Sequence, residues 1–217
     1  DVAKDAIQAA AQLEQYGFCY MDLANINPKL DAMIQLRSQF GLRSCANTLA
    51  RMLNASHAPN SLQGVFHRDV DRKHSRCAAL VNRQVSDSHT TILCFRGEGG
   101  EVEYNPERDV TLHLCQSDKE TTVDVPASLG HWVVKPKSLD SKQLRNVWQG
   151  EEVNDYATHA IIGSLSLMYI LTDKLSLADA QVQAQHCWQE RDTKWPFSEP
   201  VQNDAPAYDT LGQHQAH

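Results

Sequence analysis

Apolar positions recur along the chain with a helical period in some segments and as short or alternating runs in others. The helical period predicts helices over residues 2–16, 28–40, 42–53, 69–82, 154–173 and 176–191, with a shorter one that opens at 136–140 and ends at 148–150. The short runs predict strands over 18–23, 61–67, 90–95, 110–114, 121–125 and 129–134. This alternation is typical of an α/β fold with a mainly parallel sheet flanked by helices, to which 110–114 and 121–125 add an antiparallel extension.

Residues 40–67 form the most informative stretch. Gly41 permits a turn before a short helix, whose apolar stripe follows offsets of three, four and four at Leu42, Cys45, Leu49 and Leu53. On another face, three polar side chains recur every four residues, namely Arg43, Asn47 and Arg51. Two guanidinium groups and an amide on one face could receive a carboxylate or a phosphate.

Composition sets the broad class. The chain has 217 residues, of which 41% are hydrophobic and 22% charged, values ordinary for a globular protein. We expect one domain over residues 1–195 and a loosely ordered tail over 196–217, which is rich in Pro, Asn, Asp, Gln and His. No apolar run approaches a membrane span, so no membrane partner is expected. The six cysteines form no Cys-x-x-Cys pair, which favours buried reduced thiols and a cytoplasmic location.

The charge is unevenly distributed. The net charge is −7, yet residues 37–96 contain nine Lys or Arg and only three acids. In the helix predicted at 69–82, Val70, Cys77, Ala78 and Val81 are expected to face inward. The opposite surface then presents Arg68, Arg72, Lys73 and Arg76. Such a surface could contact a polyanion, or it could be an ordinary solvated helix face.

Two motifs resemble a known family. The run Gly-Leu-Arg-Ser-x-x-Asn-x-Leu-x-x-x-Leu-Asn at 41–54, followed by Gly-Val-Phe-His at 64–67, resembles the second half of the anthranilate phosphoribosyltransferase family. The resemblance covers roughly residues 5–192. Ala50-Arg51 stands where that family has Gly-Pro, and Ala55 where it has Pro. These departures look more like the YbiB-type (TrpD2) branch, which includes nucleic-acid binders.

The resemblance implies the α/β domain of these enzymes and phosphoribosyl transfer to a small aromatic or nitrogenous acceptor. Arg43 would then grip the acceptor's acidic group and Asn47 would orient it. Glu103 would hold part of a Mg²⁺ site, while Val102 replaces the family's aspartate there. The family's helical bundle and phosphate-binding loop have no counterpart in this sequence. We therefore expect this segment to be inactive alone and to bind phosphoribosyl diphosphate and Mg²⁺ only within a longer protein, as a homodimer.

Two alternatives remain open from the sequence. The chain could be a catalytically inactive YbiB-type protein that binds DNA or RNA through Arg51, Arg68, Arg72, Lys73 and Arg76. It could also serve mainly to support dimerisation or a missing half of the protein. A hydrolase has little support, since no serine lies in a Gly-x-Ser-x-Gly elbow, and the histidines show no metal-binding spacing.

Overall fold

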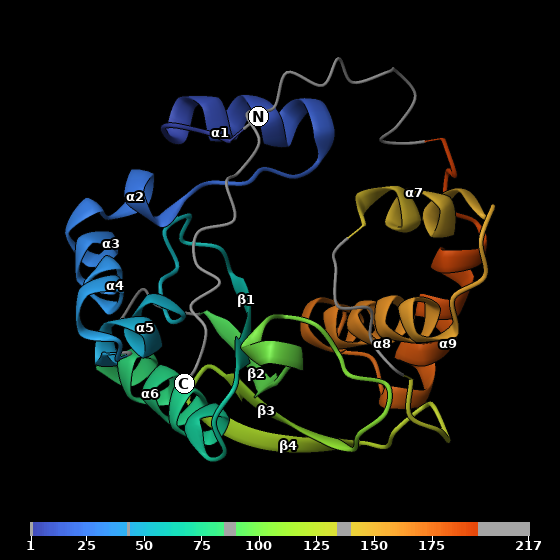
Figure 1. Cartoon of the computed structure of the whole chain (residues 1–217). Coiled ribbons are helices and arrows are strands. Elements are labelled where there is room, and N and C mark those ends of the chain that lie inside the picture. The colour runs from blue at the N-terminus through green and yellow to red at the C-terminus, as the bar shows by residue number, and fades with distance from the viewer. Residues whose placement is uncertain (1, 43, 85–89, 134–139, 195–217) are drawn as a thin grey trace, which may run out of the picture.

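The fold is built on a four-stranded mixed sheet. The structure is a computed structural model that describes residues 2–42, 44–84, 90–133 and 140–194. The strands are β1 (Asn60–Val65), β2 (Thr91–Arg96), β3 (Val110–Gln116) and β4 (Lys119–Val125), and they lie in the order β1-β2-β3-β4 (Figure 1). β1 and β2 are parallel, whereas β3 pairs antiparallel with β2 and with β4.

The α/β class and the antiparallel extension are therefore confirmed, but the sheet is mixed and not mainly parallel. Only β1 and β2 are joined by a helical crossover, α6 (Val70–Gln84), which returns the chain to the same end of the sheet. From β2 to β3 the chain passes through a loop with a single 3₁₀ turn, η1 (Glu98–Gly100). Without a crossover helix the next strand enters from the opposite end.

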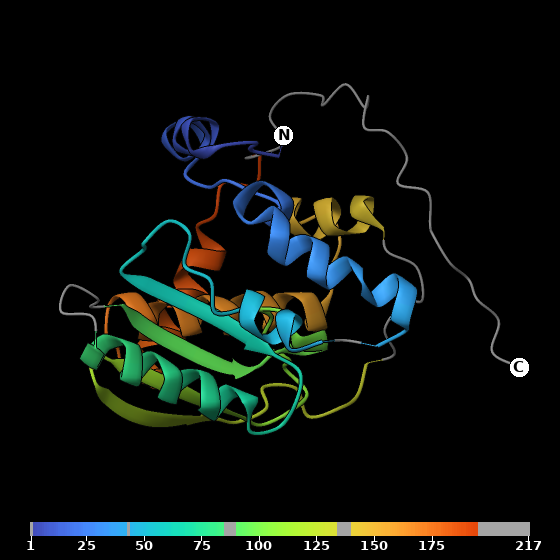
Figure 2. The same ribbon diagram turned by 90° about the vertical axis from the view of Figure 1, so that its left-hand side faces the viewer.

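Helices cover both faces of this sheet. α6 packs on one face, where Ala78 and Ala79 contact buried Cys115 of β3. α8 (Asp155–Thr172) and α9 (Leu177–Gln189) lie on the other face (Figure 2). The larger core forms there, from the buried residues Leu93, Phe95, Tyr104, Leu112, Val125, Leu167, Ile170, Leu171 and Ala180. No helix in the described ranges is long and apolar enough to cross a membrane.

The N-terminal helices pack far less tightly. They are α1 (Ala6–Tyr16), α2 (Leu23–Ile26), α3 (Pro28–Gln35), α4 (Arg37–Phe40) and α5 (Cys45–Ala50). The first four contain no buried residue, and Figure 1 shows α1 at the edge of the molecule. Several large apolar side chains of this region are exposed, among them Ile7, Phe40 and Leu42. Within the described chain, no other segment covers these apolar side chains.

α7 (Ser141–Gln149) is joined to the end of α9 by Arg191. The Arg191 guanidinium stacks 3.6 Å from the Trp188 ring centroid. It also donates to the carbonyl oxygens of Trp148 at 2.8 Å and Trp188 at 2.6 Å. One charged side chain therefore connects two helices that are separated in sequence.

Local helix signals predicted from the sequence are largely confirmed. Gly17 ends α1 with φ 75°, a conformation that glycine adopts without strain. Pro28 opens α3, where its missing N–H has no helical partner to lose. Asn154 and Ser176 cap α8 and α9 through side-chain oxygens.

Two predicted strands are wrong. Residues 18–22 are irregular and Leu23 begins α2. Residues 129–133 are also irregular, and the rest of that prediction, 134, lies outside the described residues. A strand requires a neighbouring strand for its backbone groups, and neither segment has one in the described chain. The expected helix start at 136–139 and the tail at 196–217 lie outside the described residues too, and α7 is seen from Ser141.

The buried face of α6 differs from the prediction. Ala78 is buried as expected, but Cys77 and Val81 are exposed. Polar residues take the inward positions instead, namely Asp71, His74 and Ser75. The structure therefore places a buried polar cluster between α6 and the sheet.

His74 is the titratable centre of this cluster and is 2% exposed. Its Nδ1 lies 2.9 Å from Gln63 Oε1, and Asp71 Oδ2 lies 3.8 Å from His113 Nε2. Burial lowers the pKa of His74 below its ordinary value of 6.5, and the Arg51 charge lowers it further, while Asp71 opposes both. The folded protein therefore resists protonation of His74 more than the unfolded chain does.

Stability is consequently expected to decline as the pH falls below about 6.5, because the unfolded chain binds this proton first. The His74→Gln variant should show a flatter loss of unfolding free energy between pH 7 and pH 5. Urea unfolding at several pH values measures the slope. His57→Gln, at an exposed turn position, is the control. An unchanged slope in His74→Gln would contradict the assignment.

Candidate functional site

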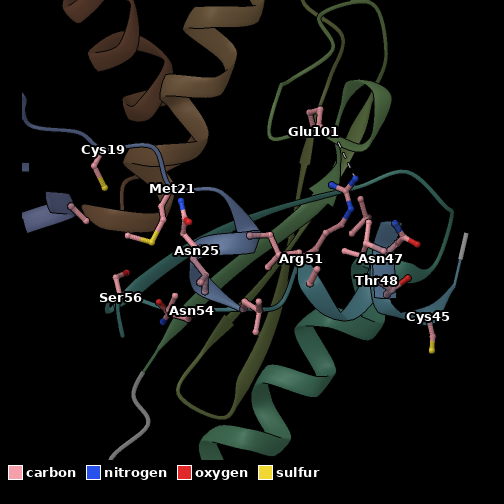
Figure 3. A pocket seen from close by; sticks show the side chains of 18 of the residues that line it. Cys19, Met21, Asn25, Cys45, Asn47, Thr48, Arg51, Asn54, Ser56 and Glu101 are labelled. Atoms are coloured by element: carbon pink, nitrogen blue, oxygen red, sulfur yellow. Dashed lines mark ion pairs between the residues drawn. The ribbon is translucent and has the colours of Figure 1, made fainter. Parts of the chain in front are cut away.

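A cavity of about 1540 Å³ lies between the N-terminal helices and the carboxyl end of β1. One wall comes from α1 to α3 and the segments around them, including Leu13, Met21 and Ile34. The opposite wall comes from α5 and from the loop after β2, with Asn47, Thr48, Arg51 and Glu101 (Figure 3). The cavity therefore has an apolar side and a polar side, the usual makeup of a small-molecule site.

Asn47 sits in the first turn of α5 and has a structural partner. The Ser44 backbone N–H donates to Asn47 Oδ1 at 3.1 Å, and the Ala46 N–H donates to Ser44 Oγ at 3.2 Å. These two bonds form a capping box that satisfies the free N–H groups of the helix start. Asn47 lines the cavity at the same time, so its role toward an acceptor stays a prediction. Arg43 lies outside the described residues.

Arg51 ends α5 and points across the cavity wall to other elements. Its Nη1 donates to the Gly64 carbonyl oxygen of β1 at 3.0 Å and also to the Gly100 carbonyl oxygen. Its Nη2 lies 3.7 Å from Glu101 Oε1. Thus the guanidinium predicted to contact phosphate already has three oxygen partners within the protein, and phosphate contact stays a prediction.

Residues 97–103, here called the acidic loop, close on themselves. The Glu98 N–H donates to the Glu103 carbonyl oxygen at 2.9 Å, and the Gly100 N–H donates to the Gly97 carbonyl oxygen at 3.0 Å. Gly99 and Gly100 take positive φ values of 61° and 86°, which glycine tolerates best. The loop therefore has a defined shape at the cavity edge.

Each carboxylate of the acidic loop has a polar neighbour. Glu98 accepts a hydrogen bond from the Asn105 side-chain amide. Glu103 accepts one from the Tyr156 hydroxyl at 3.3 Å, and Glu101 faces Arg51. Within the described ranges, no group of three or more His, Cys, Asp or Glu side chains could hold a metal ion. The Glu103 side chain is exposed, and its part in a magnesium site stays a prediction.

The basic residues around α6 form a separate surface. Arg68 precedes the helix, and Arg72, Lys73 and Arg76 are exposed on it, opposite the buried face of α6. None of these four lines the cavity, whereas Arg51 does. Of the five residues in the nucleic-acid alternative, Arg51 therefore lies at the cavity and the other four lie on the outer surface of α6 and just before it.

The ion pair of Glu101 with Arg51, and the room that Gly64 and Gly97 leave for the Glu101 backbone, could not be identified from the sequence. A Cβ on Gly64 would lie 2.1 Å from the Glu101 carbonyl oxygen, and one on Gly97 only 1.8 Å from it. The run of glycines and glutamates at 97–103 marks an unusual loop. Nothing in that run indicates that the loop folds onto β1.

No family model matches the chain, but curated sequences and solved structures are similar to it. The anthranilate phosphoribosyltransferase of Neisseria meningitidis serogroup C / serotype 2a is 34% identical over 142 residues, which are 64% of this chain and 38% of that enzyme. The enzyme of Neisseria gonorrhoeae is likewise 34% identical over 142 residues, 64% of this chain and 39% of its own length. The chain is therefore similar in sequence to anthranilate phosphoribosyltransferases over 142 residues, which supports that family.

Solved structures of the family share the fold. A variant of the Saccharomyces cerevisiae anthranilate phosphoribosyltransferase with Mg bound superposes with a TM-score of 0.65 at 16% identity, covering 83% of this chain and 54% of that chain. The same yeast enzyme in complex with PRPP and Mg gives 0.63 at 17% identity, covering 79% and 50%. The chain thus matches about half of each yeast structure, and less than two thirds of its Neisseria relatives' length.

These anthranilate phosphoribosyltransferase relatives bear out the family predicted from the motifs at 41–54 and 64–67. The finer assignment to the YbiB-type branch stays a prediction. The nucleic-acid alternative finds no support among these relatives, whose names are those of the biosynthetic enzyme.

Proposed function

We propose that this chain supplies the acceptor-binding α/β part of a phosphoribosyltransferase. The whole protein would transfer the phosphoribosyl group of phosphoribosyl diphosphate to a small aromatic or nitrogenous acceptor. One observation carries this proposal: the family motif at 41–54 forms a wall of the large cavity, in a chain 34% identical to anthranilate phosphoribosyltransferase.

The cavity lining suits such an acceptor. Leu13, Met21 and Ile34 can pack against a ring, and the α5 side can bond a polar substituent. Ser44, next to Arg43, caps α5 beside Asn47, so the motif would bring a guanidinium and an amide to one end of the helix. A charged substituent held there would orient the ring, and orientation is a main source of rate in group transfer.

Mg²⁺ would enter with the diphosphate. The ion usually binds through one or two carboxylates together with substrate phosphates and water, and Glu103 can supply one carboxylate. The relative from yeast was solved with PRPP and Mg, which supports the same requirement here. The missing aspartate at Val102 predicts weaker metal binding than in relatives that have both acids.

The test uses the full-length gene product with phosphoribosyl diphosphate, Mg²⁺ and anthranilate or related aromatic amines. Diphosphate release should be saturable and should depend on Mg²⁺. Arg43→Ala and Asn47→Ala should raise the KM for the acceptor by about 10- to 100-fold, the value of losing a hydrogen bond with a charged group. Arg76→Ala, on exposed α6, is the matched control.

Absence of both diphosphate release and phosphoribosyl diphosphate binding would contradict the proposal. Salt-sensitive binding of single-stranded DNA that weakens in an Arg68, Arg72 and Arg76 triple alanine variant would then favour the nucleic-acid alternative.

A further inference from the structure

Arg51 is one of the positions where this chain departs from the family motif, which has proline there. The structure gives the new side chain three oxygen partners, the carbonyl groups of Gly64 and Gly100 and the carboxylate of Glu101. We infer that Arg51 is a positioning residue that holds the acidic loop against β1 at the edge of the cavity. This inference rests on the proposed function, because the loop contains the carboxylate expected to meet Mg²⁺.

The bonds of Arg51 join three separate elements. The residue itself ends α5, Gly64 lies within β1, and Gly100 belongs to the acidic loop. The hydrogen bonds inside the loop, from Glu98 to Glu103 and from Gly100 to Gly97, fix its shape. They do not fix the loop relative to α5. Among the interactions described for this loop, the bond of Arg51 to the Gly100 carbonyl and its ion pair with Glu101 do so, while the bond to Gly64 holds the same guanidinium on β1.

The chemistry of arginine suits this role. A guanidinium has several N–H donors in a fixed plane and remains charged at any physiological pH. Lysine offers a single ammonium on a flexible stem and cannot reproduce that planar arrangement. The ion pair with Glu101 is the weaker contact, because the side chains of Arg51 and Glu101 are 33% and 75% exposed, and solvent screens exposed pairs. Most of the effect should therefore come from the carbonyl bonds.

The loop in turn positions Glu103. The Glu103 carbonyl oxygen accepts from Glu98 across the loop, and its carboxylate meets Tyr156 of α8. A loop released from α5 would keep the contact of Glu103 with α8 but lose its tie to the α5 wall. The geometry between the α5 wall and the Mg²⁺ ligand would then vary, which predicts weaker binding of the magnesium–diphosphate pair.

The experiment measures hydrogen–deuterium exchange of amides 97–103 in the full-length protein and its variants. Arg51→Met should raise exchange by about tenfold or more, because the hydrogen bond from the charged guanidinium to the Gly100 carbonyl exceeds the ~1.4 kcal/mol that a factor of ten represents. Arg51→Lys should be intermediate and Glu101→Gln should change little. Arg76→Met, which also removes one charge, should match the wild type. Urea unfolding of each variant separates local from global opening.

The same proteins are titrated with phosphoribosyl diphosphate and Mg²⁺, and affinity should weaken in the same order as exchange rises. If Arg51→Met weakens binding with loop exchange unchanged, Arg51 is a direct phosphate ligand and the inference is overturned. Faster exchange with unchanged binding would show that Arg51 holds the loop without positioning the Mg²⁺ ligand, and would overturn its role as a positioning residue. If the wild-type protein binds no phosphoribosyl diphosphate, the proposed function is contradicted. The exchange data still decide whether Arg51 holds the loop. Should Arg51→Met fail to fold, the order of Arg51→Lys and Glu101→Gln decides.

Discussion

Replacing Gly64 with alanine is expected to lower the free energy of unfolding by about 3 kcal/mol or more, at the upper end of overpacking costs. The added Cβ would lie 2.1 Å from the carbonyl oxygen of Glu101 and 2.4 Å from its carbonyl carbon. Both are backbone atoms and cannot rotate away. Either β1 or the acidic loop must move, and the carbonyl bonds of Arg51 to Gly64 and Gly100 oppose their separation.

Urea unfolding of Gly64→Ala measures this cost. Gly130→Ala is the matched control, because its Cβ would meet no atom within 4 Å and its backbone has no positive φ. Under the proposed function, the displaced loop should also weaken phosphoribosyl diphosphate binding by the full-length protein. A stability equal to that of the control would show that the loop does not pack on β1 as described.

Replacing Gly163 with alanine is expected to cost about 2 kcal/mol, although alanine is normally the better helix former by about 1 kcal/mol. Gly163 lies in α8, where a Cβ would come within 2.1 Å of Tyr104 Cδ1. The ring cannot easily turn aside, because Tyr104 is 2% exposed and its hydroxyl donates to the Pro126 carbonyl oxygen at 2.7 Å.

A double-mutant cycle identifies the cause. In a Tyr104→Ala background the ring is absent, so Gly163→Ala should become neutral or stabilising. Chemical denaturation of the four proteins gives the coupling energy. Equal costs of Gly163→Ala in both backgrounds would place the strain elsewhere in α8.

Local structure could be predicted where a few adjacent residues carry the signal. Pro28 after Asn27, and Asn154 before an apolar run, place helix starts because each cap bonds a backbone N–H within three residues. Alternating residues at 110–114 and 121–125 predicted the hairpin of β3 and β4 correctly, since the turn between them is short. The same reasoning failed for residues 18–23. Their apolar side chains suit a strand, but exposed Phe18 and Tyr20 meet no neighbouring strand.

The inward face of α6 shows a second kind of failure. Apolar residues were expected to face the sheet, yet Asp71 and His74 are buried while Val81 is exposed. A prediction from hydropathy makes this error because it places every polar side chain of a helix on the solvent side. A buried polar group is tolerated where partners are present, and Gln63 and His113 become partners only after β1 and β3 are in place.

The sequence by itself indicated the family resemblance, the α/β class and several helix starts and ends, because motifs, caps and periodicity act over a few residues. Tertiary structure alone decided the contacts of Arg51 with residues 13 and 49 positions away and the close approach of Tyr104 to Gly163. These depend on where distant segments of the chain meet. From the sequence, Arg51 was predicted to bind an anion. In the fold, its guanidinium instead joins α5, β1 and the acidic loop.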